Sequence, residues 1–202
     1  MAYANWLQPS KLSGSGNDTV NVSALSNNTG RNARSTNVTF KAVNCEDVVR
    51  AVNQAGKPEF GQFNSSTAAA SKEGQTLTLS GTSNSSVLTF SKGTDNIGLT
   101  IPATYNAAGV TVNNGEAITG DPGATQEYAW SIPLTVPANT DVDPKTCQIV
   151  VTDDAGHTST CTITLAAGDA MLSVSPASVD LPWDASSSAS FAVTSNTNWT
   201  VE

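Results

Sequence analysis

The sequence has little charge and little basic character. Only 13% of its 202 residues are charged, and nine Lys and Arg face 17 Asp and Glu, for a formal net charge of −8. Because phosphate contacts need clustered basic side chains, this balance argues against nucleic acid as a partner. No apolar run approaches the ~20 residues of a membrane span, so we expect a soluble protein without membrane contact. The opening residues carry no basic stretch followed by an apolar one, which predicts that a secretory signal is absent or has been removed.

Histidine and cysteine are also scarce. The single histidine, His157, follows an expected turn and has no nucleophile pattern around it, so we expect no enzyme and no cofactor. The chain has three cysteines, Cys45, Cys147 and Cys161, an odd number that cannot all form disulfides within one chain. This is consistent with folding in a reducing compartment. We expect the three cysteines to be small buried apolar side chains. The alternative is an internal disulfide between Cys147 and Cys161. No His or Cys partner stands at metal-ligand spacing.

Small polar residues and short alternating stretches dominate what is present. Thr, Ser and Asn together make up about a third of the chain, and apolar residues still reach 38%, enough for a packed core. Apolar residues alternate with polar ones in many short stretches separated by Gly, Asn, Asp or Pro. Examples are Val20/Val22, Val38/Phe40, Leu77/Leu79, Leu88/Phe90, Leu99/Ile101 and Ile163/Leu165. This pattern predicts an all-β chain built of antiparallel β-sandwiches. Residues 48–52 fit a turn of helix or a strand equally well.

The clearest hairpin joins residues 146–151 to residues 158–165. A three-residue loop 154–156, in which Gly156 supplies a positive φ, would set Ile149 opposite Cys161 and Cys147 opposite Ile163. That register places every apolar side chain of the hairpin on one face, whereas a two-residue loop would not.

Charge divides the chain into three parts. Residues 1–57 carry a net charge of +3, residues 58–169 carry −8, and residues 170–202 carry −3 with no Lys or Arg at all. The two ends are therefore opposite in sign and equal in size, and the central part holds the whole net charge.

The two ends together resemble one domain of the BACON family, bacterial Ig-like β-sandwiches associated with carbohydrate binding. Residues 172–176 and 190–201 resemble its first half. Elements of its second half stand at the other end of the chain: Trp6–Leu7, Ser13–Gly16, Val20–Val22, Asn27–Gly30, Arg34, Val38–Phe40 and Val52–Gly56. The resemblance implies a BACON-like sandwich split between the termini, with residues 1–57 as second half and residues 170–202 as first half. Residues 58–169 are a separate module, and its hairpin over residues 150–158 is similar to the closing strands of bacterial Ig-like domains, which implies an Ig-like sandwich there.

Neither half can cover its apolar face alone, so each needs the other. The resemblance implies a shared core formed by Trp6, Leu7, Val20, Val22, Val38, Phe40, Leu172, Val174, Phe191, Val193, Trp199 and Val201. The halves would close within one chain, or residues 170–202 of one chain would complete residues 1–57 of another. The short connections near Lys57 and Gly168 favour completion between chains, and both alternatives stay open.

These features predict a non-enzymatic assembly protein. Ig-like modules, unpaired cysteines and split-domain ends favour a bacteriophage virion protein, an auxiliary capsid or head-decoration protein similar to those of crAss-like phages. Its partners would be further copies and a major capsid or other virion protein. The alternative is a module that binds mucin or bacterial glycans, with Trp130 and Trp183 as possible sugar platforms. Calcium at the acidic turns 141–143 and 153–154 is left open.

Overall fold

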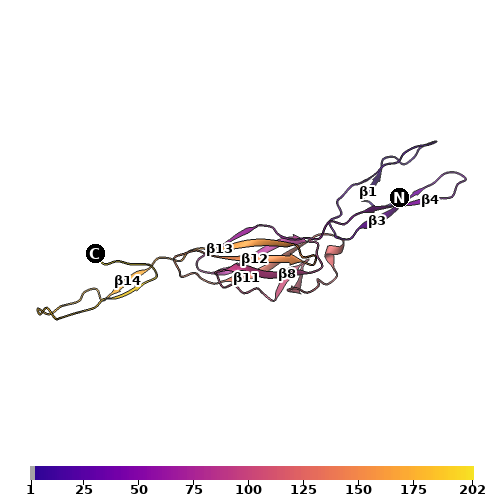
Figure 1. Ribbon diagram of the computed structural model, residues 1–202. Coiled ribbons are helices and arrows are strands. Elements are labelled where there is room, and N and C mark those ends of the chain that lie inside the picture. The colour runs from indigo at the N-terminus through magenta and orange to yellow at the C-terminus, as the bar shows by residue number, and fades with distance from the viewer. Residues whose placement is uncertain (1–2) are drawn as a thin grey trace.

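The computed structural model describes residues 3–202 as three bodies in a row (Figure 1). We call residues 3–57 the N-terminal arm, residues 58–169 the central sandwich and residues 170–202 the C-terminal arm. The arms lie at opposite ends of the sandwich. Apart from one short 3-10 turn, the regular elements are strands, almost all of them antiparallel, which confirms the all-β sandwich class expected from the alternating stretches.

The central sandwich consists of two sheets that face each other. Its strands are β5 (Gly61–Phe63), β6 (Thr67–Ala70), β7 (Gln75–Ser83), β8 (Leu88–Asp95), β9 (Thr104–Ala107), β10 (Val110–Asn113), β11 (Tyr128–Val136), β12 (Lys145–Asp153) and β13 (Thr158–Leu165). One sheet has the order β10-β9-β11-β7-β5 and the other the order β6-β13-β12-β8. The 3-10 turn η1 (Pro122–Ala124) precedes β11. One pair departs from the expected pattern, because β6 runs parallel to β13.

Period-2 alternation builds the core between the two sheets. Along β11, residues 128, 130, 132, 134 and 136 are buried, whereas most of the intervening residues are exposed. The same alternation on β12 and β13 buries Ile149, Val151 and Ile163 completely. Every second side chain of a strand points to the same face, so these apolar sets meet between the sheets and exclude water.

The β12–β13 hairpin has the register expected from its sequence. Ile149 stands opposite Cys161 and Cys147 opposite Ile163, and Gly156 has a φ of 88° in the connecting turn. The turn closes through a hydrogen bond from the Gly156 amide to the Asp153 carbonyl, 3.1 Å long. The hairpin prediction is therefore confirmed.

The cysteines follow the expectation only in part. Cys147 and Cys161 are fully buried in the core, and both are free thiols. The alternative of a disulfide between them is therefore not formed. Cys45 is exposed, and its expected burial is wrong. The reason is local: the Cys45 amide donates to the Ala42 carbonyl in a tight turn beyond the end of a strand, away from any core.

Thiol reactivity should separate these three side chains. Burial, with a contribution from the Asp95 side chain, raises the pKa of Cys147 to about 12, and burial also raises the pKa of Cys161. Since the thiolate is the reactive form, an aromatic disulfide reagent at neutral pH should titrate one thiol in the native chain and three after denaturation. Cys45→Ser should leave no reactive thiol in the native protein. A single thiol after denaturation without reductant would contradict the free state of Cys147 and Cys161.

The arms consist of two-stranded sheets, two in the N-terminal arm and one in the C-terminal arm. The N-terminal arm contains β1 (Leu7–Pro9) paired with β2 (Val22–Ala24), and β3 (Arg34–Phe40) paired with β4 (Val48–Gln54). Residues 48–52 are thus strand, one of the two alternatives left open. The C-terminal arm contains β14 (Leu172–Ser175) paired with β15 (Ala192–Ser195). Within residues 3–202 no strand of one arm pairs with a strand of the other.

Candidate functional site

The N-terminal arm has a small buried centre where its two hairpins meet. Trp6, Leu7 and Val38 are buried there, with Val52 half-buried against them. The Arg34 guanidinium lies 4.7 Å from the centre of the Trp6 ring, a cation–π contact that closes the solvent side of the indole. These three buried residues are among the predicted core positions, and the single chain already packs them.

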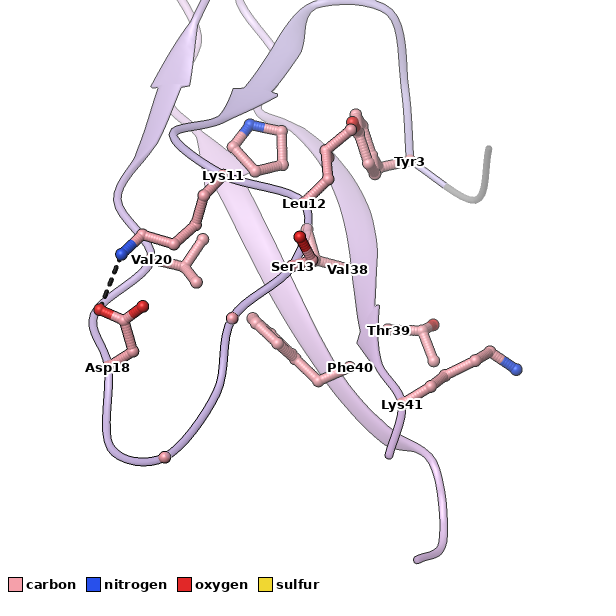
Figure 2. Close-up of a pocket in the computed structure, with 13 residues that line it drawn as sticks. Tyr3, Lys11, Leu12, Ser13, Asp18, Val20, Val38, Thr39, Phe40 and Lys41 are labelled. Carbon is pink, nitrogen blue, oxygen red and sulfur yellow. Dashed lines mark hydrogen bonds and ion pairs between the residues drawn. The ribbon is translucent and has the colours of Figure 1, made fainter. Parts of the chain in front are cut away.

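Beyond this centre the arm opens into a cleft of about 520 Å³. The cleft lies between the loop 10–21 and β3. Figure 2 shows Leu12, Val20 and Phe40 along its walls and the Lys11–Asp18 ion pair at its outer edge. Phe40 keeps 43% of its surface exposed and Leu12 keeps 80%. The end of the N-terminal arm therefore presents apolar side chains to water around a space that no described residue fills.

Charge on this cleft comes from paired side chains at its rim. Lys11 Nζ lies 2.7 Å from Asp18 Oδ1, and the hydrogen bond that Lys11 donates lowers the pKa of the Asp18 carboxyl. Lys41, also at the rim, pairs with Asp47. Both pairs are exposed and contribute little to stability, so they remain free to exchange partners with an incoming charged surface.

The C-terminal arm presents a second apolar face. A groove of about 230 Å³ is lined almost entirely by apolar side chains: Leu172, Val174, Phe191, Val193, Trp199 and Val201. Val174 and Val193 stand directly opposite each other across the β14–β15 pair, which places them on one face of this sheet. The face has no covering layer among the described residues, because this arm is a single two-stranded sheet.

All twelve predicted core residues thus lie on the two arms, but the structure brings them together in two separate groups. Trp6, Leu7 and Val38 are buried, whereas Val20 is half-buried and Val22 and Phe40 are exposed. On the C-terminal arm, Val193 is half-buried and the other five are exposed, including Trp199 at 49%. Among residues 3–202, the two arms of the chain do not pack together into one sandwich. Tyr3 and Leu12, which also line the cleft, were missed because neither falls on an alternating stretch.

The two tryptophans proposed as sugar platforms have opposite environments. Trp130 is buried in the central core, where its ring makes edge contacts with Phe63 and Phe90 at centroid distances of 5.1 and 5.0 Å. It has no free face, and its assignment as a glycan contact is wrong. Trp183 lies in the loop between β14 and β15 and is 98% exposed.

A buried polar joint fixes the N-terminal arm to the central sandwich. The Asn84 side chain is fully buried and donates to the backbone carbonyls of Thr29, Lys57 and Pro58, while its oxygen accepts from the Phe60 amide at 3.0 Å. These four bonds gather two separate stretches of backbone, at residue 29 and at residues 57–60, around one side chain.

Arg31 ties the same joint to the 3-10 turn η1 and the residue before it. Its guanidinium donates to the Asn84 carbonyl and forms an ion pair with Asp121, which raises the pKa of Arg31 although partial burial acts against this. The Arg31 amide donates to the Gly123 carbonyl at 3.0 Å. Backbones approach so closely here that a Cβ at Gly30 would lie 2.3 Å from the Thr125 carbonyl carbon. The backbones at this joint therefore pack directly against each other.

The C-terminal arm has a smaller joint. The Asn196 side chain donates to the carbonyls of Thr140 and Asp169, at 3.1 and 2.8 Å, and accepts from the Met171 amide at 2.8 Å. Asp169 also forms an ion pair with Lys72. One asparagine thus anchors each arm to its end of the sandwich.

The acidic turns and the histidine are occupied by local contacts. Asp153 accepts from the backbone and the ring of His157, whose side chain is exposed, and Asp141 pairs with Lys145. Within residues 3–202, no group of three or more His, Cys, Asp or Glu side chains is placed to hold a metal ion. In the same range, no helix has the length and apolar character needed to cross a membrane.

Comparison with known proteins bears on the N-terminal arm. Residues 1–55 match the family described as "BACON: Putative binding domain, N-terminal". The N-terminal arm is similar to BACON domains. The match confirms the resemblance drawn from Trp6–Leu7, Val38–Phe40 and the segments between them, over about a quarter of the chain. The resemblance of the C-terminal arm to the other half of a BACON domain stays a prediction.

The other similarities of this chain are weak. No curated protein matches the chain. Two endo-fucoidan hydrolases of glycoside hydrolase family 107, MfFcnA4 and MfFcnA9, are similar to it at 13% and 12% identity with TM-scores of 0.32 and 0.29. They cover 82% and 81% of this chain, which spans only 22% and 26% of theirs. The chain is thus about a quarter of the length of these structures, and superposition at this level defines no shared site.

Proposed function

We propose that this chain is a non-enzymatic structural protein that links subunits through its BACON-like N-terminal arm and its C-terminal arm. The observation that carries the proposal is the pair of uncovered apolar surfaces, one on each arm. The two arms lie at opposite ends of the well-packed sandwich (Figure 1). Apolar patches of this kind on a protein surface mark sites of association. The setting we propose is a bacteriophage virion, as an auxiliary capsid or head-decoration protein that contacts further copies and a major capsid or other virion protein.

Two features support this setting. The three cysteines are free, which suits assembly in a reducing host cytoplasm before release. The central sandwich is a compact module whose strong core depends on neither arm, so it can act as a spacer between two attachment points.

Light scattering coupled to size-exclusion chromatography tests the assembly proposal. The 20.7 kDa chain should elute with a mass that rises as its concentration increases through the micromolar range. A mass of one chain at every concentration would contradict it. The virion setting has a separate test, since peptides of this chain should appear in purified phage particles, and their absence from particles of the phage that encodes it would contradict that part alone.

The second candidate function is binding of mucin or bacterial glycans. It rests on Trp183, an indole that is 98% exposed and available for stacking on a sugar ring, and on the family description of a binding domain. A glycan array should then show a signal that Trp183→Ala abolishes while the fold persists. Binding unaffected by this substitution, or no binding, would contradict a role for Trp183.

A further inference from the structure

We infer that the C-terminal arm of one copy packs against the cleft of the N-terminal arm of the next, so that copies join head to tail in an open chain. This inference rests on the proposed function and specifies which surfaces meet. Its partner is a second copy of the same chain, and its site is the 520 Å³ cleft beside β3 facing the apolar groove of the β14–β15 sheet.

The first argument is the incompleteness of both surfaces. An isolated two-stranded sheet is at best marginally stable in water, and it becomes stable when more strands or another layer cover its apolar face. The β14–β15 sheet is such a sheet, with Phe191 and Trp199 each 49% exposed on its apolar face. The N-terminal arm offers the missing layer, because Leu12, Val20 and Phe40 line an open cleft (Figure 2).

The second argument is charge, which distinguishes unlike from like pairing. Residues 170–202 carry three acidic groups and no Lys or Arg, whereas residues 1–57 carry six basic groups and three acidic ones. Lys11 and Lys41 line the cleft together with one carboxylate, Asp18, so the lining carries a net positive charge. Two C-terminal arms would bring like charges together, while a C-terminal and an N-terminal arm attract each other, so electrostatics selects head-to-tail contact.

The third argument is the placement of the arms. They lie at opposite ends of the sandwich, each anchored by a buried or half-buried asparagine, Asn84 on one side and Asn196 on the other (Figure 1). A contact between two different surfaces, repeated from copy to copy, generates an open chain unless its rotation closes a ring. With surfaces at opposite poles, the second copy extends the first.

Two charge substitutions, one on each arm, test the pairing. Phe40→Asp places a charge in the cleft, and Phe191→Asp places one in the groove; both positions are about half exposed, so the change does not require burial in a core. Each variant alone should be a monomer, since each keeps one working surface. An equimolar mixture should form a 1:1 dimer of twice the 20.7 kDa mass and grow no further, because both outer ends are blocked.

Matched controls introduce the same charge outside the two surfaces. Val43→Asp lies on the N-terminal arm and Leu181→Asp on the C-terminal arm; both are highly exposed apolar residues that line neither the cleft nor the groove. Both controls should assemble as the unaltered chain does. Formation of the 1:1 dimer in the mixture also shows that the arm left intact in each variant is folded.

The outcomes separate the inference from the proposed function. Dimers of Phe40→Asp alone, or of Phe191→Asp alone, would show that like arms pair, which overturns the head-to-tail contact while leaving assembly intact. A mixture that remains monomeric while the unaltered chain assembles would overturn it too. An unaltered chain that remains monomeric at every concentration would overturn both.

Discussion

Trp130→Ala should lower the free energy of unfolding of the central sandwich by about 3–5 kcal/mol, the range found for removal of large buried aromatic side chains. The indole is 2% exposed and touches two other aromatic rings, so its removal leaves a cavity that the surrounding strands cannot fill by small shifts. A loss of this size is a large part of the stability of an ordinary domain. Denaturant unfolding followed by far-UV circular dichroism measures it.

Trp183→Ala is the matched control, because the same atoms are removed from a side chain that is 98% exposed. The free energy of unfolding should then change by no more than about 0.5 kcal/mol. If Trp130→Ala lowered the free energy of unfolding by less than about 1 kcal/mol, the packing of this tryptophan between the two sheets would be contradicted.

Asn84→Ala should cost about 2–3 kcal/mol and should also loosen the N-terminal arm. The substitution removes the partner of three backbone carbonyls and one amide at this part-buried joint, and each group that loses its partner away from water carries a desolvation penalty. Hydrogen exchange at the amides of Arg31 and Asn32, which donate to Gly123 and Ala124 across the joint, should become faster than in the unaltered chain.

Asn64→Ala provides the comparison for this prediction. Its side chain is exposed and donates one bond to the Ser80 hydroxyl, 3.1 Å away, so its loss should change stability by no more than about 0.5 kcal/mol. Equal stability and equal amide exchange for the two variants would contradict the view of Asn84 as the centre of the joint.

Alternation along the chain was enough to predict the fold class and the β12–β13 register. In that hairpin the apolar pattern and the turn residues specify the same pairing, and the structure has it. The same signal would have placed Trp130 correctly. It stands in phase with Tyr128 and Ile132 on β11, and all three are buried. The sugar-platform hypothesis for Trp130 was wrong because it considered the residue type without its strand.

The joint could not be predicted, because its parts are far apart in the sequence. Arg31 meets a carbonyl 53 positions away and a carboxylate 90 positions away, and Asn84 lies in a stretch rich in Ser and Asn with nothing to mark it. Polar side chains of this kind have no periodic pattern. Only the tertiary fold decides which of the 18 asparagines, Asn84 among them, become buried and hydrogen-bonded.

The tight joint around Gly30 and Asn84 has a geometric consequence for any chain of copies. The close backbone packing at Gly30 and the hydrogen bonds of Asn84 would hold the rotation between the N-terminal arm and the sandwich at the same value in every copy. Identical units related by a constant rotation and translation trace a helix, so this joint, the Asn196 joint of the C-terminal arm and the arm-to-arm contact together would determine the pitch and curvature of the filament. A flexible linker in the same place would give a chain of copies with variable orientation and no defined helical repeat.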